Sequence, residues 1–125
     1  MKKTSVPLVI AFTPDYFIPA ATCLYSIITS MQAEGELHVI CLLSEELPER
    51  LKLKIQLIGE GRTCYSFVNL QGKLQHIYID QKYTEAASYR LLLPDLLPEY
   101  KKVIYIDCDI IVRNDLVQLY HSIDL

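Results

Sequence analysis

Two aspartates separated by one residue follow an apolar stretch near the end of the chain. The sequence VIYIDCDIIV, residues 103–112, places Asp107 and Asp109 directly after a run of β-forming residues. Carboxylates repel each other and resist burial, so both belong where water, a metal ion or a ligand reaches them. On an extended segment, residues two apart face the same way, and both carboxylates would then point to one side. Such a pair of hard oxygen donors suits Mg²⁺ or Mn²⁺, which take further ligands from water and substrate phosphates.

The same two aspartates have other interpretations. An aspartate at a strand end often only caps a turn or the next helix. Phosphatases of the haloacid dehalogenase type also place D-x-D after an apolar strand, and Asp107 would then be the nucleophile. In those enzymes the motif lies on the first core strand with most of the catalytic domain after it, whereas here only residues 110–125 follow Asp109. The phosphatase interpretation is therefore the weaker one.

The rest of the chain predicts alternating strands and helices. Apolar runs predict strands over residues 6–12, 36–43, 63–70 and 103–106. Helices are predicted from Pro19 to near Gly35, over 45–58 with Ser44 as N-cap, and over 84–93. Residues 77–79 predict a weak strand or an extended loop, and residues 114–125 a helical turn and a tail. This order predicts a Rossmann-like α/β fold, with a mainly parallel sheet, helices on both faces, and ligands at the carboxyl ends of the strands.

Composition excludes several classes of function. The 125 residues suffice for one domain, and the net charge of −3 without a Lys/Arg block excludes nucleic acid as a partner. The four cysteines lack metal-ligand spacing and are predicted to be small buried residues in a reducing compartment. His38 and His76 are expected to be structural. No stretch is convincing as a signal peptide or membrane span, so we expect a cytoplasmic protein, with peripheral attachment at the inner face of the membrane as the alternative.

Three blocks of the sequence together resemble a known family. They are VIAFTPDYFIPAATCLYSI, LHVICLL and ASYRLLLPDLLPEYKKVIYIDCDIIVRNDLVQLY, in this order along nearly the whole chain. The third block is highly specific, and with it the chain resembles the nucleotide-diphospho-sugar glycosyltransferases of family 8, which include glycogenin and lipopolysaccharide galactosyl- and glucosyltransferases. The resemblance implies a GT-A type fold. It also implies metal-dependent transfer of a hexose from a UDP-sugar to a hydroxyl acceptor, with retention of anomeric configuration.

The resemblance also implies roles for individual residues. Asp107 and Asp109 match the motif that holds Mn²⁺, or Mg²⁺, against the UDP diphosphate, and the backbone of Cys108 would contact the ribose. Arg90 would lie close to the sugar-nucleotide. The first-strand loop would frame uracil and ribose, through Ala11, Phe12, Thr13, Asp15 and Tyr16. This loop departs from the family pattern, because many members have an acidic residue at Thr13 and Asn at Asp15.

The resemblance finally implies partners and a domain boundary. The expected partners are a UDP-hexose donor and a glycan or lipid-linked glycan acceptor such as a growing lipopolysaccharide, and nothing in the sequence indicates an oligomeric state. Family members are about twice this length, in line with large α/β domains. Residues 1–125 are therefore expected to be the nucleotide-sugar-binding N-terminal part of a catalytic domain, with a histidine metal ligand and the acceptor pocket beyond Leu125. No residue here is a convincing catalytic nucleophile, and a non-catalytic nucleotide-binding fragment is the alternative.

Overall fold

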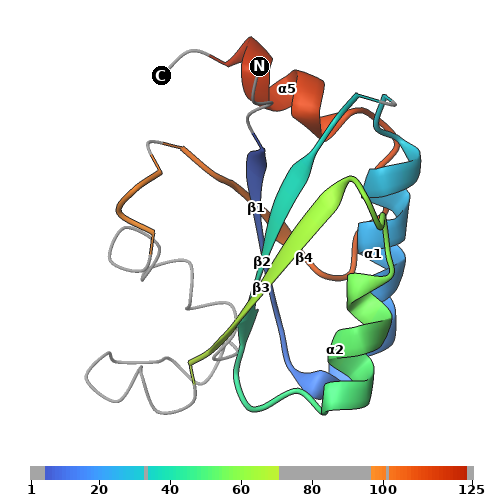
Figure 1. Cartoon of the computed structure of the whole chain (residues 1–125), viewed down its shortest axis with the longest axis vertical. Helices are drawn as coiled ribbons and strands as arrows, with labels where there is room; N and C mark the ends of the chain where they lie inside the picture. The colour runs from blue at the N-terminus through green and yellow to red at the C-terminus, as the bar shows by residue number, and fades with distance from the viewer. Residues whose placement is uncertain (1–4, 33, 71–96, 101, 124–125) are drawn as a thin grey trace.

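The chain forms a four-stranded sheet with helices packed against it (Figure 1). The computed structural model describes residues 5–32, 34–70, 97–100 and 102–123. The strands are β1 (Val6–Phe12), β2 (Leu37–Leu43), β3 (Thr63–Asn69) and β4 (Ile104–Asp107). The helices are the 3₁₀ helix η1 (Pro14–Tyr16), α1 (Phe17–Thr29), α2 (Glu49–Gln56) and α5 (Leu116–Ser122).

All strand pairs in the sheet are parallel, and the strand order is β3-β2-β1-β4. Strand β1 pairs with β2 from Val6 opposite Leu37 to Phe12 opposite Leu43. On its other side it pairs with β4, and the last pair joins Ala11 and Asp107. Two strands thus lie on one side of β1 and the last strand on the other, so the order of the strands reverses at β1. The parallel α/β fold predicted from the sequence is confirmed.

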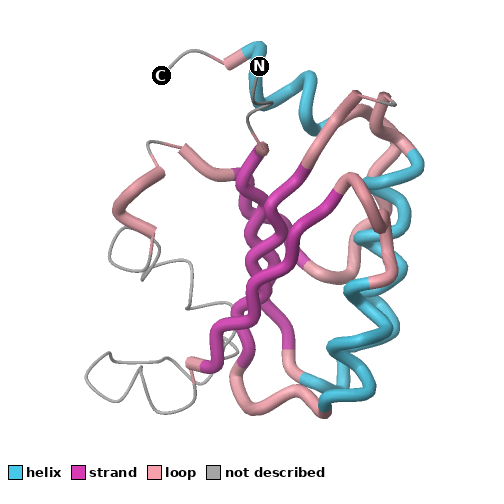
Figure 2. Tube along the Cα trace, viewed as in Figure 1, coloured by secondary structure: helices cyan, strands magenta, loops and turns pink. Residues whose placement is uncertain are grey.

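Two hydrophobic cores cover the two faces of the sheet. Alternate residues of β1 point to opposite sides, and all seven are buried. The larger core lies beneath α1, α2 and α5, which Figures 1 and 2 show on one side of the sheet and at its end. The smaller core lies on the opposite face, where Leu97, Tyr100 and Val103 pack against it. Among the described residues, helices contribute only to the larger core, and the helix predicted over 84–93 lies outside the described residues.

The strands predicted over residues 6–12, 36–43, 63–70 and 103–106 are confirmed to within one residue at each end, while the starts of two helices are wrong. The weak strand or extended loop predicted over residues 77–79 lies outside the described residues. Helix α1 begins at Phe17, so Pro19 is its third residue rather than its first. Proline is tolerated there because the first-turn N–H groups have no partner within the helix. Helix α2 begins after Pro48 rather than after Ser44. Residues 44–48 form a loop instead, because Pro48 disfavours the helical conformation at Leu47, the residue before it.

The four cysteines are free, and their environments differ. Cys23 and Cys41 are buried as predicted and Cys108 is half-buried, whereas Cys64 is exposed, which makes the prediction wrong for that residue. Cys64 lies on β3, the outermost of the described strands on its side of the sheet, where fewer neighbours cover a side chain. Among the described helices, none has the length and apolar content needed to span a bilayer.

Candidate functional site

The carboxyl ends of β1 and β4 lie next to each other. The register places Ala11 beside Asp107, so Phe12 and Thr13 lie near Cys108 just beyond the last pair. In open parallel α/β sheets, ligands bind in the crevice outside the carboxyl ends of the strands, where the strand order reverses. In this sheet the order reverses between these two strands. The topology therefore favours this edge as the binding site.

Asp107 and Asp109 occupy this edge with accessible carboxylates. Asp107 is the last residue of β4 and is exposed, while Cys108 and Asp109 form a turn after the strand. The extended geometry expected for both aspartates therefore applies only up to Asp107, since the hydrogen-bonded ladder ends there. Asp109 is also exposed. The structure thus places both carboxylates where a ligand can reach them.

The donor chemistry of the two aspartates fits a divalent cation. Within the described part of the chain, no group donates a hydrogen bond to either carboxylate and no cation pairs with it. Hard carboxylate oxygens are the ligands that Mg²⁺ and Mn²⁺ prefer. The described residues contain no group of three or more His, Cys, Asp and Glu side chains suited to a metal. Asp107 and Asp109 would therefore supply only part of a coordination shell.

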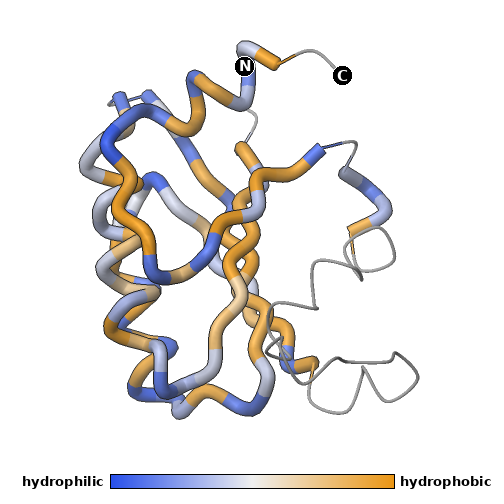
Figure 3. Tube along the Cα trace, turned by 180° about the vertical axis from the view of Figure 1, so that it is seen from behind, coloured by the Kyte–Doolittle hydropathy of each residue, from blue (hydrophilic) through white to orange (hydrophobic). Residues whose placement is uncertain are grey.

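Helix α1 holds the backbone on both sides of Asp109. The Cys23 Sγ donates to the carbonyl of Asp107 at 3.8 Å. Burial, and to a lesser degree the neighbouring Cys108, raises the pKa of the Cys23 thiol to about 11, so this donor keeps its proton. Further along, the Ser26 Oγ accepts from the Val112 N–H at 2.9 Å, and the Ser30 Oγ donates to the Val112 carbonyl at 3.0 Å. Figure 3 shows the segment between β4 and α5 running along α1, with a hydrophobic stretch between two hydrophilic ones.

The end of this segment is fixed by Asp115. Its Oδ1 accepts from the N–H groups of Val117 and Gln118, at 2.9 and 3.2 Å, which caps the start of α5. Its Oδ2 accepts from the Gln32 N–H at 3.0 Å, in the loop that follows α1. Asp115 therefore has the structural role of a helix cap, which the sequence also allowed for Asp107 and Asp109. Among the described residues, Asp107 and Asp109 cap no helix.

The first-strand loop offers side chains to the same edge. The side chains of Ala11 and Phe12 are buried, so only their backbone could contact a ligand. Thr13 is half-buried, and its carbonyl accepts from the Tyr16 N–H at 2.9 Å, which closes the turn of η1. Asp15 is exposed, and Tyr16 is 54% exposed. The predicted contacts to a nucleotide are thus open to side chains at Thr13, Asp15 and Tyr16, and their role stays a prediction.

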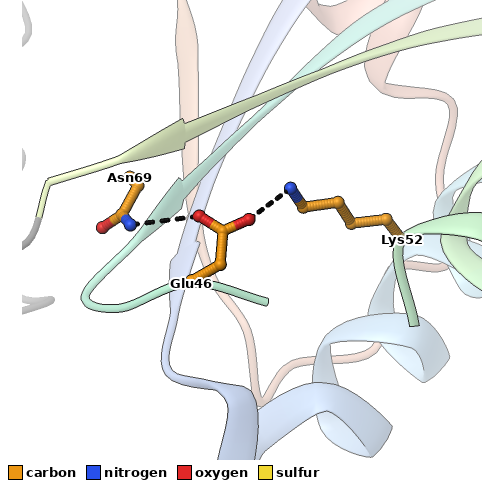
Figure 4. Close-up of polar contacts among 3 residues, drawn as sticks. All are labelled: Glu46, Lys52 and Asn69. Atoms are coloured by element: carbon orange, nitrogen blue, oxygen red, sulfur yellow. Dashed lines mark hydrogen bonds and ion pairs between the residues drawn. The ribbon is translucent and has the colours of Figure 1, made fainter. Parts of the chain in front are cut away.

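The carboxyl ends of β2 and β3 carry a different, internally paired group (Figure 4). Glu46 accepts from Lys52 Nζ at 2.6 Å and from Asn69 Nδ2 at 3.2 Å. The hydrogen bonds from Lys52 and then Asn69 hold the pKa of the Glu46 carboxyl below its ordinary value. The Lys52 Nζ also lies 5.7 Å from the centroid of the Phe67 ring. These side chains connect the loop after β2 to the end of β3. Glu46 is therefore already paired with Lys52 and Asn69, unlike Asp107 and Asp109 among the described residues.

Comparison with known proteins establishes the family of this chain. The sequence model of glycosyl transferase family 8 matches residues 7–125. The chain belongs to this family. It is 26% identical to glycosyltransferase 8 domain-containing protein 1 of Bos taurus, a match that covers 97% of this chain and 34% of the relative. It is 24% identical to general stress protein A of Bacillus subtilis (strain 168), over 96% of this chain and 43% of the relative. The family 8 chain thus spans less than half the length of these relatives.

Solved structures share the fold. The apo structure of the bifunctional glycosyltransferase WbbM superposes with a TM-score of 0.83 at 22% identity, over 100% of this chain and 22% of that one. An active-site mutant of LgtC superposes with a TM-score of 0.74 at 20% identity, over 95% of this chain and 42% of that one. At these identities the likeness establishes the fold alone. It confirms the GT-A type fold that the resemblance implied.

The structure therefore places some of the predicted site residues at two adjacent strand ends. The register pairs Ala11 with Asp107, so the strand end that leads into the first-strand loop lies next to the one that leads into the turn of Cys108 and Asp109. Arg90 lies outside the described residues. Sequence analysis missed Ser26 and Ser30, which hold Val112. A serine in the apolar stripe of a buried helix was the available signal, because a buried hydroxyl needs a partner.

Proposed function

We propose that the family 8 chain is the nucleotide-sugar-binding part of a metal-dependent, retaining glycosyltransferase. It would use a UDP-hexose as donor and transfer the hexose to a hydroxyl group of a glycan or lipid-linked glycan. The observation that supports this most directly is the pair of accessible carboxylates, Asp107 and Asp109, at the point where the strand order reverses. Membership of family 8 favours this reaction over the phosphatase alternative.

Each of the described site residues would contact a different part of the nucleotide-sugar or its cation. Asp107 and Asp109 would hold the cation, and the backbone of Cys108 would face the ribose. Thr13, Asp15 and Tyr16, next to them on the first-strand loop, would contact the base and the ribose. Thr13 can hydrogen-bond a base edge through its hydroxyl but not as an anion.

The chemical need for the carboxylates follows from the reaction. As the bond between sugar and phosphate breaks, negative charge builds up on the diphosphate that leaves, and a bound cation would offset that charge. Asp107 and Asp109 would serve by fixing its position before the bond breaks. We assign no covalent nucleophile among the residues of this chain. Arg90, predicted to lie near the sugar-nucleotide, would belong to the same site.

Three further parts of the proposal concern the whole protein. Residues 1–125 would be the N-terminal part of a catalytic domain, with the third metal ligand and the acceptor pocket contributed from beyond Leu125. This agrees with the 34% and 43% of the relatives' lengths that the matches cover. A cytoplasmic location, with at most peripheral contact at the inner face of the membrane, stays a prediction.

The test is the binding of UDP by the chain with and without Mn²⁺. Isothermal titration would measure the Kd for UDP in wild type, Asp109→Asn and the control Glu60→Gln. Glu60 is an exposed carboxylate in the turn before β3, at the opposite edge of the sheet, so the control loses the same charge away from the site. We expect Mn²⁺ to lower the Kd for UDP in wild type. In the presence of Mn²⁺, Asp109→Asn should raise this Kd at least about tenfold.

Two results would refute the proposal. The first is UDP binding that does not depend on Mn²⁺, and the second is an Asp109→Asn variant that binds Mn²⁺ and UDP as tightly as wild type. Comparison of UDP with CDP and GDP tests the base separately. If the three nucleotides bind equally, the uracil contacts assigned to the first-strand loop are wrong while the metal site stands.

A further inference from the structure

Two serines of α1 bind both backbone polar groups of a single residue outside the helix. The Ser26 Oγ accepts from the Val112 N–H at 2.9 Å and donates to the Cys23 carbonyl at 2.6 Å. The Ser30 Oγ donates to the Val112 carbonyl at 3.0 Å. Residues four apart lie on the same face of a helix, one turn from each other. The two hydroxyls therefore fit around one peptide segment.

This contact takes the place of secondary structure. Residues 110–113 belong to neither a helix nor a strand, so the N–H and carbonyl of Val112 have no ladder partners. Ser26 is the buried polar residue among the residues that the structure describes. The buried Ser26 hydroxyl thus has a partner for its single donor and for one of its two acceptor lone pairs. The arrangement thus satisfies a backbone position that packing alone would leave unpaired.

The position of Val112 decides what the contact does. Of the three apolar residues after Asp109, Ile110 and Ile111 are exposed, and only Val112 packs against the core. On the other side of Asp109, the carbonyl of Asp107 accepts from Cys23, on the same helix. Helix α1 therefore forms hydrogen bonds with the backbone two residues before Asp109, at Asp107, and three residues after it, at Val112. The turn that carries the Asp109 carboxylate is held at both ends by one rigid element.

We propose that Ser26 and Ser30 are positioning residues for the Asp109 carboxylate, which they hold in place through the backbone of Val112. This inference rests on the proposed role of Asp109 as a metal ligand. A cation with near-octahedral geometry tolerates little displacement of its ligands. Mutation of residues that orient a ligand without contacting the metal commonly weakens metal affinity about 10- to 100-fold. Loosening the Val112 contact should therefore weaken metal binding more than it weakens nucleotide binding.

The variants that test this are Ser26→Ala, Ser30→Ala and the conservative Ser30→Thr. The matched controls are Thr22→Ala and Thr29→Ala, since those hydroxyls lie on the same helix but donate only to α1 carbonyls, at Ile18 and Ser26. Mn²⁺ affinity in the presence of UDP would be measured by electron paramagnetic resonance. UDP affinity without metal, thermal unfolding and hydrogen exchange of the Val112 amide would be measured on the same proteins.

We expect each serine-to-alanine variant to weaken Mn²⁺ binding about tenfold. UDP binding without metal should change less than twofold, and so should Mn²⁺ binding by both threonine controls. Ser30→Thr keeps the hydroxyl and should restore wild-type Mn²⁺ affinity. The Val112 amide should exchange slowly in wild type and faster in Ser26→Ala.

Several outcomes would overturn the inference, and they differ from those that overturn the proposed function. If wild type binds Mn²⁺ with UDP but Ser30→Ala only lowers the unfolding temperature, the serines are merely structural. An unprotected Val112 amide in wild type refutes the contact itself. If Ser26→Ala does not fold, the test is the Mn²⁺ affinity of Ser30→Ala and Ser30→Thr. Equal affinities in these two variants would overturn the inference. If wild type binds no Mn²⁺, the proposed function fails first and the inference fails with it.

Discussion

Two glycines after α2 offer a matched test of the packing in this sheet. Gly59 and Gly61 both have a positive φ, of 73° and 89°, so alanine at either site meets the same backbone strain. A Cβ at Gly59 would lie 2.9 Å from both Ile28 Cδ1 and Thr63 Cγ2, whereas a Cβ at Gly61 meets no atom within 4 Å. The two substitutions therefore differ mainly in the close contacts that a Cβ at Gly59 would make with Ile28 and Thr63.

The expected costs follow from these contacts. Alanine in the left-handed region costs about 1–2 kcal/mol, which applies to both variants. Overpacking adds about 1–3 kcal/mol at Gly59 alone, because the Ile28 side chain is buried and cannot move freely. Gly59→Ala should thus lower the free energy of unfolding by about 1–3 kcal/mol more than Gly61→Ala. Urea denaturation followed by circular dichroism would measure both values, compared at a constant m-value.

A third variant checks the cause of the difference. Ile28→Val removes the Cδ1 atom that a Cβ at Gly59 would meet at 2.9 Å. The cost of Gly59→Ala should then be smaller in the Ile28→Val background than in wild type, with a coupling energy of about 0.5 kcal/mol or more. Equal costs for Gly59→Ala and Gly61→Ala, or no coupling to Ile28→Val, would refute the packing described for this turn.

Two other measurements address the cap of α5 and the buried thiols. Asp115→Ala should lower the free energy of unfolding by about 1–2 kcal/mol, because it removes the bonds to Val117, Gln118 and Gln32. Asp115→Asn should lower the free energy of unfolding less, because an asparagine side chain can still cap the helix. Urea denaturation would measure both variants together with the control Asn114→Ala, which changes an exposed neighbouring residue, and equal values for Asp115→Ala and Asn114→Ala would contradict the cap. Burial raises the pKa of Cys41 to about 12, above its ordinary value of 9.0. Unfolded chains therefore release this proton first, and stability should fall by about 1.4 kcal/mol per pH unit above pH 9 for this group. Urea denaturation from pH 8 to 10 should give a shallower slope for Cys41→Ala, and identical slopes would contradict the assigned pKa.

The sequence predicts the strands better than it predicts how they meet. Val6–Phe12 is a continuous apolar run, and Leu37–Leu43 is apolar apart from His38, because both faces of a central parallel strand are covered. This pattern is visible without the structure. The start of α2 was not visible in the same way. Ser44 has the chemistry of a cap, but Pro48 disfavours a helical conformation at Leu47, so the helix begins only after the proline.

For the candidate site too, local sequence patterns were informative and long-range contacts were not. Asp107 and Asp109 were found from their types and spacing, since carboxylates after an apolar strand need an explanation. The partner of Ser26 lies 86 positions away in the chain, and no local pattern predicts such a contact. The hydroxyls of Thr22, Ser26 and Thr29 follow one helical spacing, yet Thr22 and Thr29 bond only within α1 while Ser26 reaches Val112.

The place of β1 between β2 and β4 has a consequence for how the protein is made. The chain emerges from the ribosome starting at its N-terminus, so β1, β2 and β3 are available to associate long before β4 exists. During that interval β1 is an open edge, and its entirely apolar sequence is of the kind that recruits foreign strands into aggregates. The strand that delivers Asp107 is also the one that seals this edge. Completion of the proposed metal-binding site and protection of the nascent sheet would then be a single late event in biogenesis.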